Sequence, residues 1–197
     1  MSIVFLKSFL LCIILKLIIA SETNRTYLVK KDFISGMKSG EFTVYDHLGK
    51  VIQYRLESKI GLTHQIRLFE GSSKTLLATL NGKITPAMYK ATVSILSKNK
   101  NQWKNGTIEQ NYKIVGNKFT IQFNDDKLMM ETDPFSLDTK FIAKQSNATL
   151  AKFHKRVSSL FWRNKYDLQV LSDKYPDELY LLGIASKDHT NKKIHRG

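Results

Sequence analysis

The residues best suited to bind a charged ligand are concentrated in one stretch of the chain, from Lys152 to Lys165. Cations alternate there with large aromatic residues such as Phe153 and Trp162. Ammonium and guanidinium groups beside aromatic rings suit acidic lipid headgroups and also suit stacked single-stranded bases. The opposite interpretation is that the cations lie in solvated loops while the aromatic rings fill the core. The candidate anion-binding residues are Lys152, Lys155, Arg156, Arg163 and Lys165.

The other reactive residue types form no catalytic or metal-binding pattern. The sequence has no metal-ligand spacing among its histidines and no partner cysteine for them. Neither a nucleophile-elbow motif nor a glycine-rich phosphate loop is present. The acidic pair Asp125 and Asp126 has the composition of a hairpin turn. We therefore expect no enzymatic activity, no metal site and no cofactor. The five histidines, for which structural or solvent-facing roles are expected, are His47, His64, His154, His189 and His195.

The whole chain of 197 residues is strongly basic, with a formal net charge of +14. Such a charge favours anionic partners such as nucleic acid, acidic lipid headgroups or sulfated glycans. It is also compatible with a surplus of lysine that only keeps the protein soluble. A second cationic group surrounds Trp103 and allows the same two interpretations; it consists of Lys98, Lys100 and Lys104.

The first twenty residues predict a signal peptide over residues 1–20. Lys7 precedes a mostly apolar run, and Ala20 is a small residue followed by a polar segment. The alternative is an uncleaved, single-pass N-terminal anchor. Cleavage would remove the only cysteine, Cys12, and would place the protein in the secretory lumen or outside the cell, where no nucleic-acid partner is expected. Three sequons are then candidate glycosylation sites, at Asn24, Asn105 and Asn147.

Short runs that alternate between apolar and polar residues follow the leader. Residues 119–123 are an example, with Phe119, Ile121 and Phe123 on one face. Roughly twelve such strands are predicted at regular spacing, and two of them are placed at 110–115 and 159–163. This rhythm is typical of an antiparallel barrel or sandwich. We expect one domain over residues 26–190 and a basic tail over residues 191–197.

The segment PDELYLLGIASKDH breaks this pattern, because Leu179 to Ala185 would be apolar on every side of a helix. Asp177 and Glu178 suit the positive end of the helix dipole. A helix that is apolar all round must be buried, and seven residues span only about 10 Å, too little to cross a bilayer. A closed β-barrel leaves an interior that such a helix can fill. The predicted central helix contains Leu179, Leu182, Gly183 and Ile184.

Three stretches, in this order, resemble the tubby C-terminal-like superfamily, which includes the LURP-one-related proteins and the phospholipid scramblases. They are GEFTVYDHLGKVIQYRLES, IRLFEGSSKTLLATLNGK and ATLAKFHKRVSSLFWRNKYDLQVLSDKYPDELYLLGIAS. The resemblance implies a mostly β fold, an antiparallel closed barrel of about twelve strands around a buried, apolar C-terminal helix. It also implies lipid binding, although the phosphoinositide-binding cations of tubby proteins cannot be placed here residue by residue. The Pro-rich extension and Cys-rich cluster of scramblases are missing from this sequence.

The composition, the leader and the resemblance together lead to one leading expectation. We expect a secreted, monomeric, non-enzymatic domain that binds an anionic ligand, either an acidic phospholipid or a glycan, through a basic surface. The alternatives are an interaction module that presents its loops to a protein partner, and a scramblase-like lipid activity.

Overall fold

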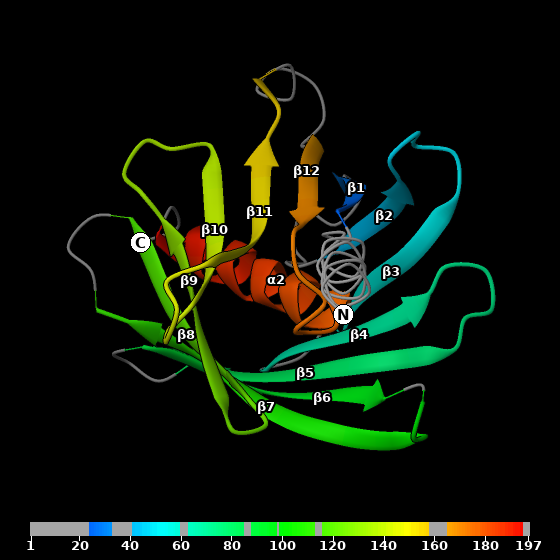
Figure 1. Cartoon of the computed structure of the whole chain (residues 1–197), viewed down its shortest axis with the longest axis horizontal. Helices are drawn as coiled ribbons and strands as arrows, with labels where there is room; N and C mark the ends of the chain where they lie inside the picture. The colour runs from blue at the N-terminus through cyan, green and yellow to red at the C-terminus, as the bar shows by residue number, and fades with distance from the viewer. Residues whose placement is uncertain are drawn as a thin grey trace, which may run out of the picture.

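The structure is a computed structural model that describes residues 24–32, 41–59, 63–84, 88–97, 99–112, 116–157 and 165–194. These residues form twelve strands closed into a single barrel, followed by one helix, α2 (Figure 1). The strands are β1 (Arg25–Lys31), β2 (Phe42–Asp46), β3 (Ile52–Lys59), β4 (His64–Glu70), β5 (Leu76–Ile84), β6 (Tyr89–Ser97), β7 (Gln102–Asn111), β8 (Asn117–Phe123), β9 (Asp126–Thr132), β10 (Asp138–Ala143), β11 (Thr149–Lys155) and β12 (Lys165–Val170).

Each strand pairs antiparallel with its neighbours in the chain, and β1 closes the barrel by pairing with both β2 and β12. Alternate residues of each strand point into the barrel. In β8 the inward residues Phe119, Ile121 and Phe123 are all buried, as their alternation predicts. The predicted twelve-stranded closed barrel is therefore confirmed.

Helix α2 (Asp177–Ile194) runs inside the ring of strands (Figure 1). The predicted central residues Leu179, Leu182, Gly183 and Ile184 are all buried, and the predicted acidic residues occupy the first turn. The helix is longer than the predicted apolar run: it continues to Ile194, so that residues 191–194, expected in a tail, belong to it. Residues 195–197 lie outside the described residues. Among the helices of the described residues, none is long and apolar enough to cross a membrane.

One of the predicted strands needs correction. The strand predicted at 110–115 is in fact β7, which begins at Gln102 and ends at Asn111. Tyr112, expected to face the core, is 80% exposed. The sequence of β7 shows no alternation of apolar and polar residues, because Ile108 is the one fully buried side chain of this strand. The strand predicted at 159–163 lies outside the described residues.

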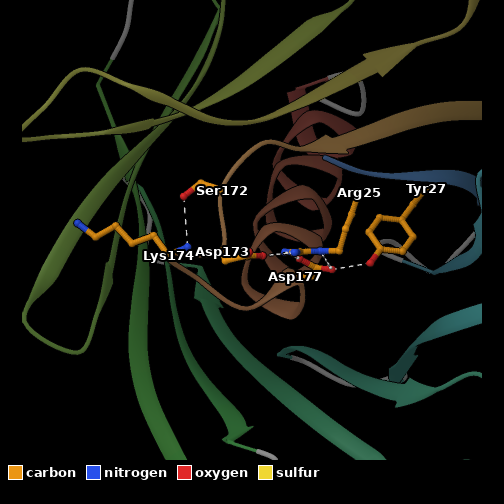
Figure 2. Close-up of polar contacts among 6 residues, drawn as sticks. All are labelled: Arg25, Tyr27, Ser172, Asp173, Lys174 and Asp177. Carbon is orange, nitrogen blue, oxygen red and sulfur yellow. Dashed lines mark hydrogen bonds and ion pairs between the residues drawn. The ribbon is translucent and has the colours of Figure 1, made fainter. Parts of the chain in front are cut away.

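A polar network fixes the N-terminus of α2 to β1 (Figure 2). The Arg25 guanidinium donates two hydrogen bonds to Asp177, at 2.8 and 3.1 Å, and also pairs with Asp173. The Tyr27 hydroxyl donates to Asp177 at 2.5 Å. The hydrogen bond from Arg25 to Asp177 raises the pKa of Arg25 above its usual value. Bidentate pairs of this kind fix orientation as well as adding stability.

We expect Asp177→Ala to lower the free energy of unfolding by about 2–4 kcal/mol, because the change leaves Arg25 and Tyr27 without a buried acceptor. The matched control is Asp173→Ala, which removes a carboxylate that is 57% exposed and should cost less than about 1 kcal/mol. Urea denaturation of both variants checks this prediction. Equal effects would show that Asp177 is not the main anchor of the helix.

Candidate anion-binding site at the barrel mouth

One end of the barrel, which we call the mouth, has polar groups inside it. The C-terminal half of α2 lies there, attached to β1 by the ion pair of Lys31 with Asp188. It is attached to β10 by a hydrogen bond from Lys187 to Thr139. Because the apolar half of α2 ends at Ala185, the residues that follow bring charge and hydrogen-bonding groups into the mouth.

A cavity of about 380 Å³ opens at the mouth, within the size range of small-molecule sites. Its apolar side is aromatic. The rings of Phe153 and Tyr166 stack with centroids 4.6 Å apart, and Phe42 meets Tyr166 edge-on at 6.5 Å. Burial raises the pKa of Tyr166 above its usual value, so this hydroxyl stays neutral. The neutral polar groups of the lining come from Asn117, Thr132, Ser136 and Asn191, and its one carboxylate is that of Asp188.

Two lysines, Lys155 and Lys187, line this cavity. Lys155 points inward because it follows the buried Phe153 by two positions along β11. Among the residues that the structure describes, neither lysine forms an ion pair with a carboxylate. The neighbouring carboxylate of Asp188 forms its ion pair with Lys31. A charge removed from water without a counter-charge is costly. The two ammonium groups therefore bring positive charge to a cavity whose one carboxylate, Asp188, is paired with Lys31.

Burial is the main influence on the pKa of Lys187. Burial, assisted by the positive charge of Lys155, lowers the pKa of Lys187 to about 8, although Asp188 acts in the opposite direction. Its hydrogen-bond acceptor Thr139 is fully buried and also bonds Thr132 at 2.9 Å. Lys187 therefore has one hydroxyl contact and only a partial counter-charge, from Asp188.

The structure separates the candidate residues predicted from the sequence. Lys155 is in the cavity, whereas Lys152 is exposed on the outer face of β11. Arg156 forms a bidentate pair with Asp167, at 2.6 and 2.7 Å, and this pairing raises the pKa of Arg156. Lys165 is partly buried at the start of β12, and Arg163 lies outside the described residues. The four described cations therefore do not form one continuous binding surface.

The remaining predicted positions are dispersed. Asn24 and Asn147 are exposed, the latter in the turn between β10 and β11. Asn105 is in the middle of β7, where its side chain accepts a hydrogen bond from Ser94 at 2.7 Å. In the second cationic group, Trp103 is 47% exposed on β7. Lys98, the leader 1–20 with Cys12, and His195 lie outside the described residues.

The histidines differ in their surroundings. His64 is buried, bonds the Tyr89 hydroxyl at 2.8 Å and stacks on His189 with ring centroids 3.9 Å apart. His154 pairs with Asp138 at 2.6 Å on the outer face. Within the described residues, no group of three or more His, Cys, Asp or Glu residues could hold a metal ion.

The main candidate residue that the sequence does not indicate is Lys187. Cations are common near the C-terminal end of a helix, so its type and position alone do not point to binding. Only the closed barrel shows that this position is enclosed by β10 and β11. Comparison with protein families gives a match of residues 25–185 to the family model described as LURP-one-related. Comparisons with curated proteins and with solved structures gave no significant match.

Proposed function

Because the chain belongs to the LURP-one-related family, part of the tubby C-terminal-like barrels, we propose that it is a non-enzymatic domain that binds an anionic ligand at the barrel mouth. The observation that carries this proposal is the pair Lys155 and Lys187, which face one cavity and form no ion pair among the described residues; the carboxylate of Asp188 in the same cavity pairs with Lys31. The ligand's acidic group binds between the two ammonium groups, and its apolar part contacts Phe153 and Tyr166. An acidic phospholipid or an acidic glycan would supply the charge.

The proposed setting is the secretory pathway, as the composition of residues 1–20 suggests. The exposure of Asn24 and Asn147 supports their modification in that compartment, because an acceptor asparagine must be reachable. This part of the proposal is independent of the ligand site. Determining the N-terminal residue and glycan occupancy of protein recovered from cells would test it.

The binding proposal is tested with soluble probes, a short-chain phosphatidic acid below its micellar concentration and a sulfated oligosaccharide, by calorimetry. We expect Lys155→Gln to weaken binding by about tenfold, equivalent to about 1.4 kcal/mol. The matched control, Lys152→Gln, removes a lysine three residues away on the same strand that faces outward, and should bind as the unmodified chain does.

Salt provides a second control for the same proposal. Raising the salt concentration from about 0.1 to about 1 M shortens the Debye length from about 10 to about 3 Å and should weaken binding. Equal losses in Lys155→Gln and Lys152→Gln would indicate a diffuse surface interaction and contradict the mouth site. Absence of binding to both probes would contradict the proposed function itself.

A further inference from the structure

Exposed apolar side chains surround the mouth. Four large ones, which we call the apolar rim, are Met88, Tyr112, Phe135 and Val157, with exposed fractions of 41%, 80%, 103% and 61%. Each is in a different strand connection: β5 to β6, β7 to β8, β9 to β10, and β11 to β12. Four of the six connections at this end thus carry one of them; in the other two, the structure describes only the polar residues Asp32, Glu41 and Thr63.

The opposite end of the barrel is different in character. Its described turns at 71–75, 99–101, 124–125 and 144–148 contain mainly Gly, Ser, Thr, Asn, Asp, Gln and Lys residues. The hairpin there between β2 and β3 exposes Leu48, Val51 and Ile52, and Trp103 is 47% exposed at the start of β7. Exposed apolar residues are therefore spread over more strand connections at the mouth than at the opposite end, and the β2–β3 hairpin provides a control surface.

Phe135 is the most informative member of the apolar rim. It follows Pro134 in a turn closed by a hydrogen bond from Ser136 to Asp133 at 3.1 Å, and its φ is 59°. This turn position favours glycine, because a bulky side chain with positive φ is strained. The ring is also fully exposed, so the phenylalanine gains nothing from burial within this chain. Strained, exposed aromatic residues of this kind are expected where they serve binding.

The rim and the cavity together match the chemistry of a membrane surface. A lipid interface offers an apolar layer to aromatic and aliphatic side chains beside a layer of anionic headgroups. The mouth presents the complement of both, since the apolar rim surrounds a cavity lined by Lys155 and Lys187, neither of which forms an ion pair among the described residues. A soluble glycan would match the cations but not the rim.

We propose that the mouth docks on an anionic lipid surface, with the apolar rim in the interfacial layer and one lipid headgroup in the cavity. This inference rests on the proposed function and adds the source of the anion and the orientation of the barrel. In this inference the barrel attaches to one leaflet and stays outside the bilayer.

The test is flotation with vesicles of phosphatidylcholine, with and without phosphatidylserine. The rim variant Phe135→Gly with Val157→Ser should bind the phosphatidylserine vesicles at least about tenfold more weakly. Because glycine suits the turn, this variant should fold at least as well as the unmodified chain. The matched control, Leu48→Ser with Val51→Ser, removes exposed apolar groups from the opposite end and should bind normally. All variants share residues 1–23, so any binding by that segment is common to them.

The outcomes separate the inference from the proposed function. Normal vesicle binding by the rim variant, with binding of the soluble phosphatidic acid retained, would overturn the inference alone. If the unmodified chain did not bind the soluble probes, both the proposed function and the inference would be overturned. If light scattering showed a dimer that the rim variant abolished, without vesicle binding, the rim would be a contact between two copies and the inference would be wrong.

Orientation gives a positive readout for the same inference. A polarity-sensitive fluorophore on Phe135→Cys, in a chain also carrying Cys12→Ser, should shift to shorter wavelength on phosphatidylserine vesicles. The same fluorophore on Leu48→Cys should not shift. A shift at Leu48 alone would place the opposite end on the membrane and overturn the inference.

Discussion

Replacing Gly183 with leucine is expected to prevent the barrel from closing around α2. A Cβ atom built at Gly183 would lie 3.0 Å from Phe141 Cε1 and 3.3 Å from both Ile121 Cδ1 and Met130 Sδ. These three side chains come from β10, β8 and β9, and all are buried. A leucine adds three more carbons, and side chains enclosed by the barrel wall have nowhere to move. We expect a loss of more than about 3 kcal/mol, a large part of the typical stability of a domain.

Gly183→Ala is the matched control for this prediction. Its single methyl group requires neighbouring side-chain ends to shift by a few tenths of an ångström, and alanine favours a helix over glycine by about 1 kcal/mol. The two effects oppose each other, so the change should be within about 1 kcal/mol. Urea denaturation and the soluble fraction on expression measure both variants. A Gly183→Leu variant of ordinary stability would contradict close packing between α2 and the barrel.

The sequence indicates strands best where burial alternates with exposure. Phe119, Ile121 and Phe123 show this in β8. In β7 the inward positions near the middle are Gly106 and Ile108. A Cβ at Gly106 would come within 2.5 Å of the Gln122 carbonyl oxygen, so close strand packing excludes a larger residue there. One apolar residue cannot produce an alternating pattern. The strand was therefore predicted too close to the C-terminus, at 110–115 instead of Gln102–Asn111.

The site was predictable only in part, because it depends on the register between strands and on the closure of the barrel around α2. The buried Phe153 implies that Lys155 points inward and Lys152 outward, so alternation alone distinguishes these two candidates. The pairing of Arg156 with Asp167 depends on the register between β11 and β12, which no local pattern specifies. The burial of Lys187 depends on a barrel long enough to enclose the polar half of α2.

Lys187→Met is expected to have opposite effects on stability and on binding. Methionine has a similar length and removes a partly buried ammonium group that forms no ion pair among the described residues. A pKa of about 8, against an ordinary value of 10.5, corresponds to an unfavourable contribution of up to about 3 kcal/mol. We expect the variant to be about 1–3 kcal/mol more stable at pH 7. Binding of the short-chain phosphatidic acid should fall by at least about tenfold.

The pH dependence identifies Lys187 as the cause. Below pH 8 the lysine is protonated in both the folded and unfolded chains, so the full penalty is present. Between about pH 8 and 10.5 the folded chain binds fewer protons than the unfolded chain, and the stability of the unmodified protein should rise relative to the variant. Its anion binding should weaken over the same range, as the ammonium group becomes neutral.

Urea denaturation of the unmodified chain and of Lys187→Met across this pH range measures the difference. Lys152→Met is the matched control, because Lys152 is exposed on the outer face and its removal should leave both stability and binding nearly unchanged. A Lys187→Met protein that is less stable at pH 7 would mean that the bond to Thr139 outweighs the burial of the charge. Since Thr139 keeps its hydrogen bond with Thr132 in the variant, we expect the charge to dominate. A lysine of a binding site should destabilise the protein without ligand and be neutralised when an anion binds. A lysine of a structural ion pair should do neither.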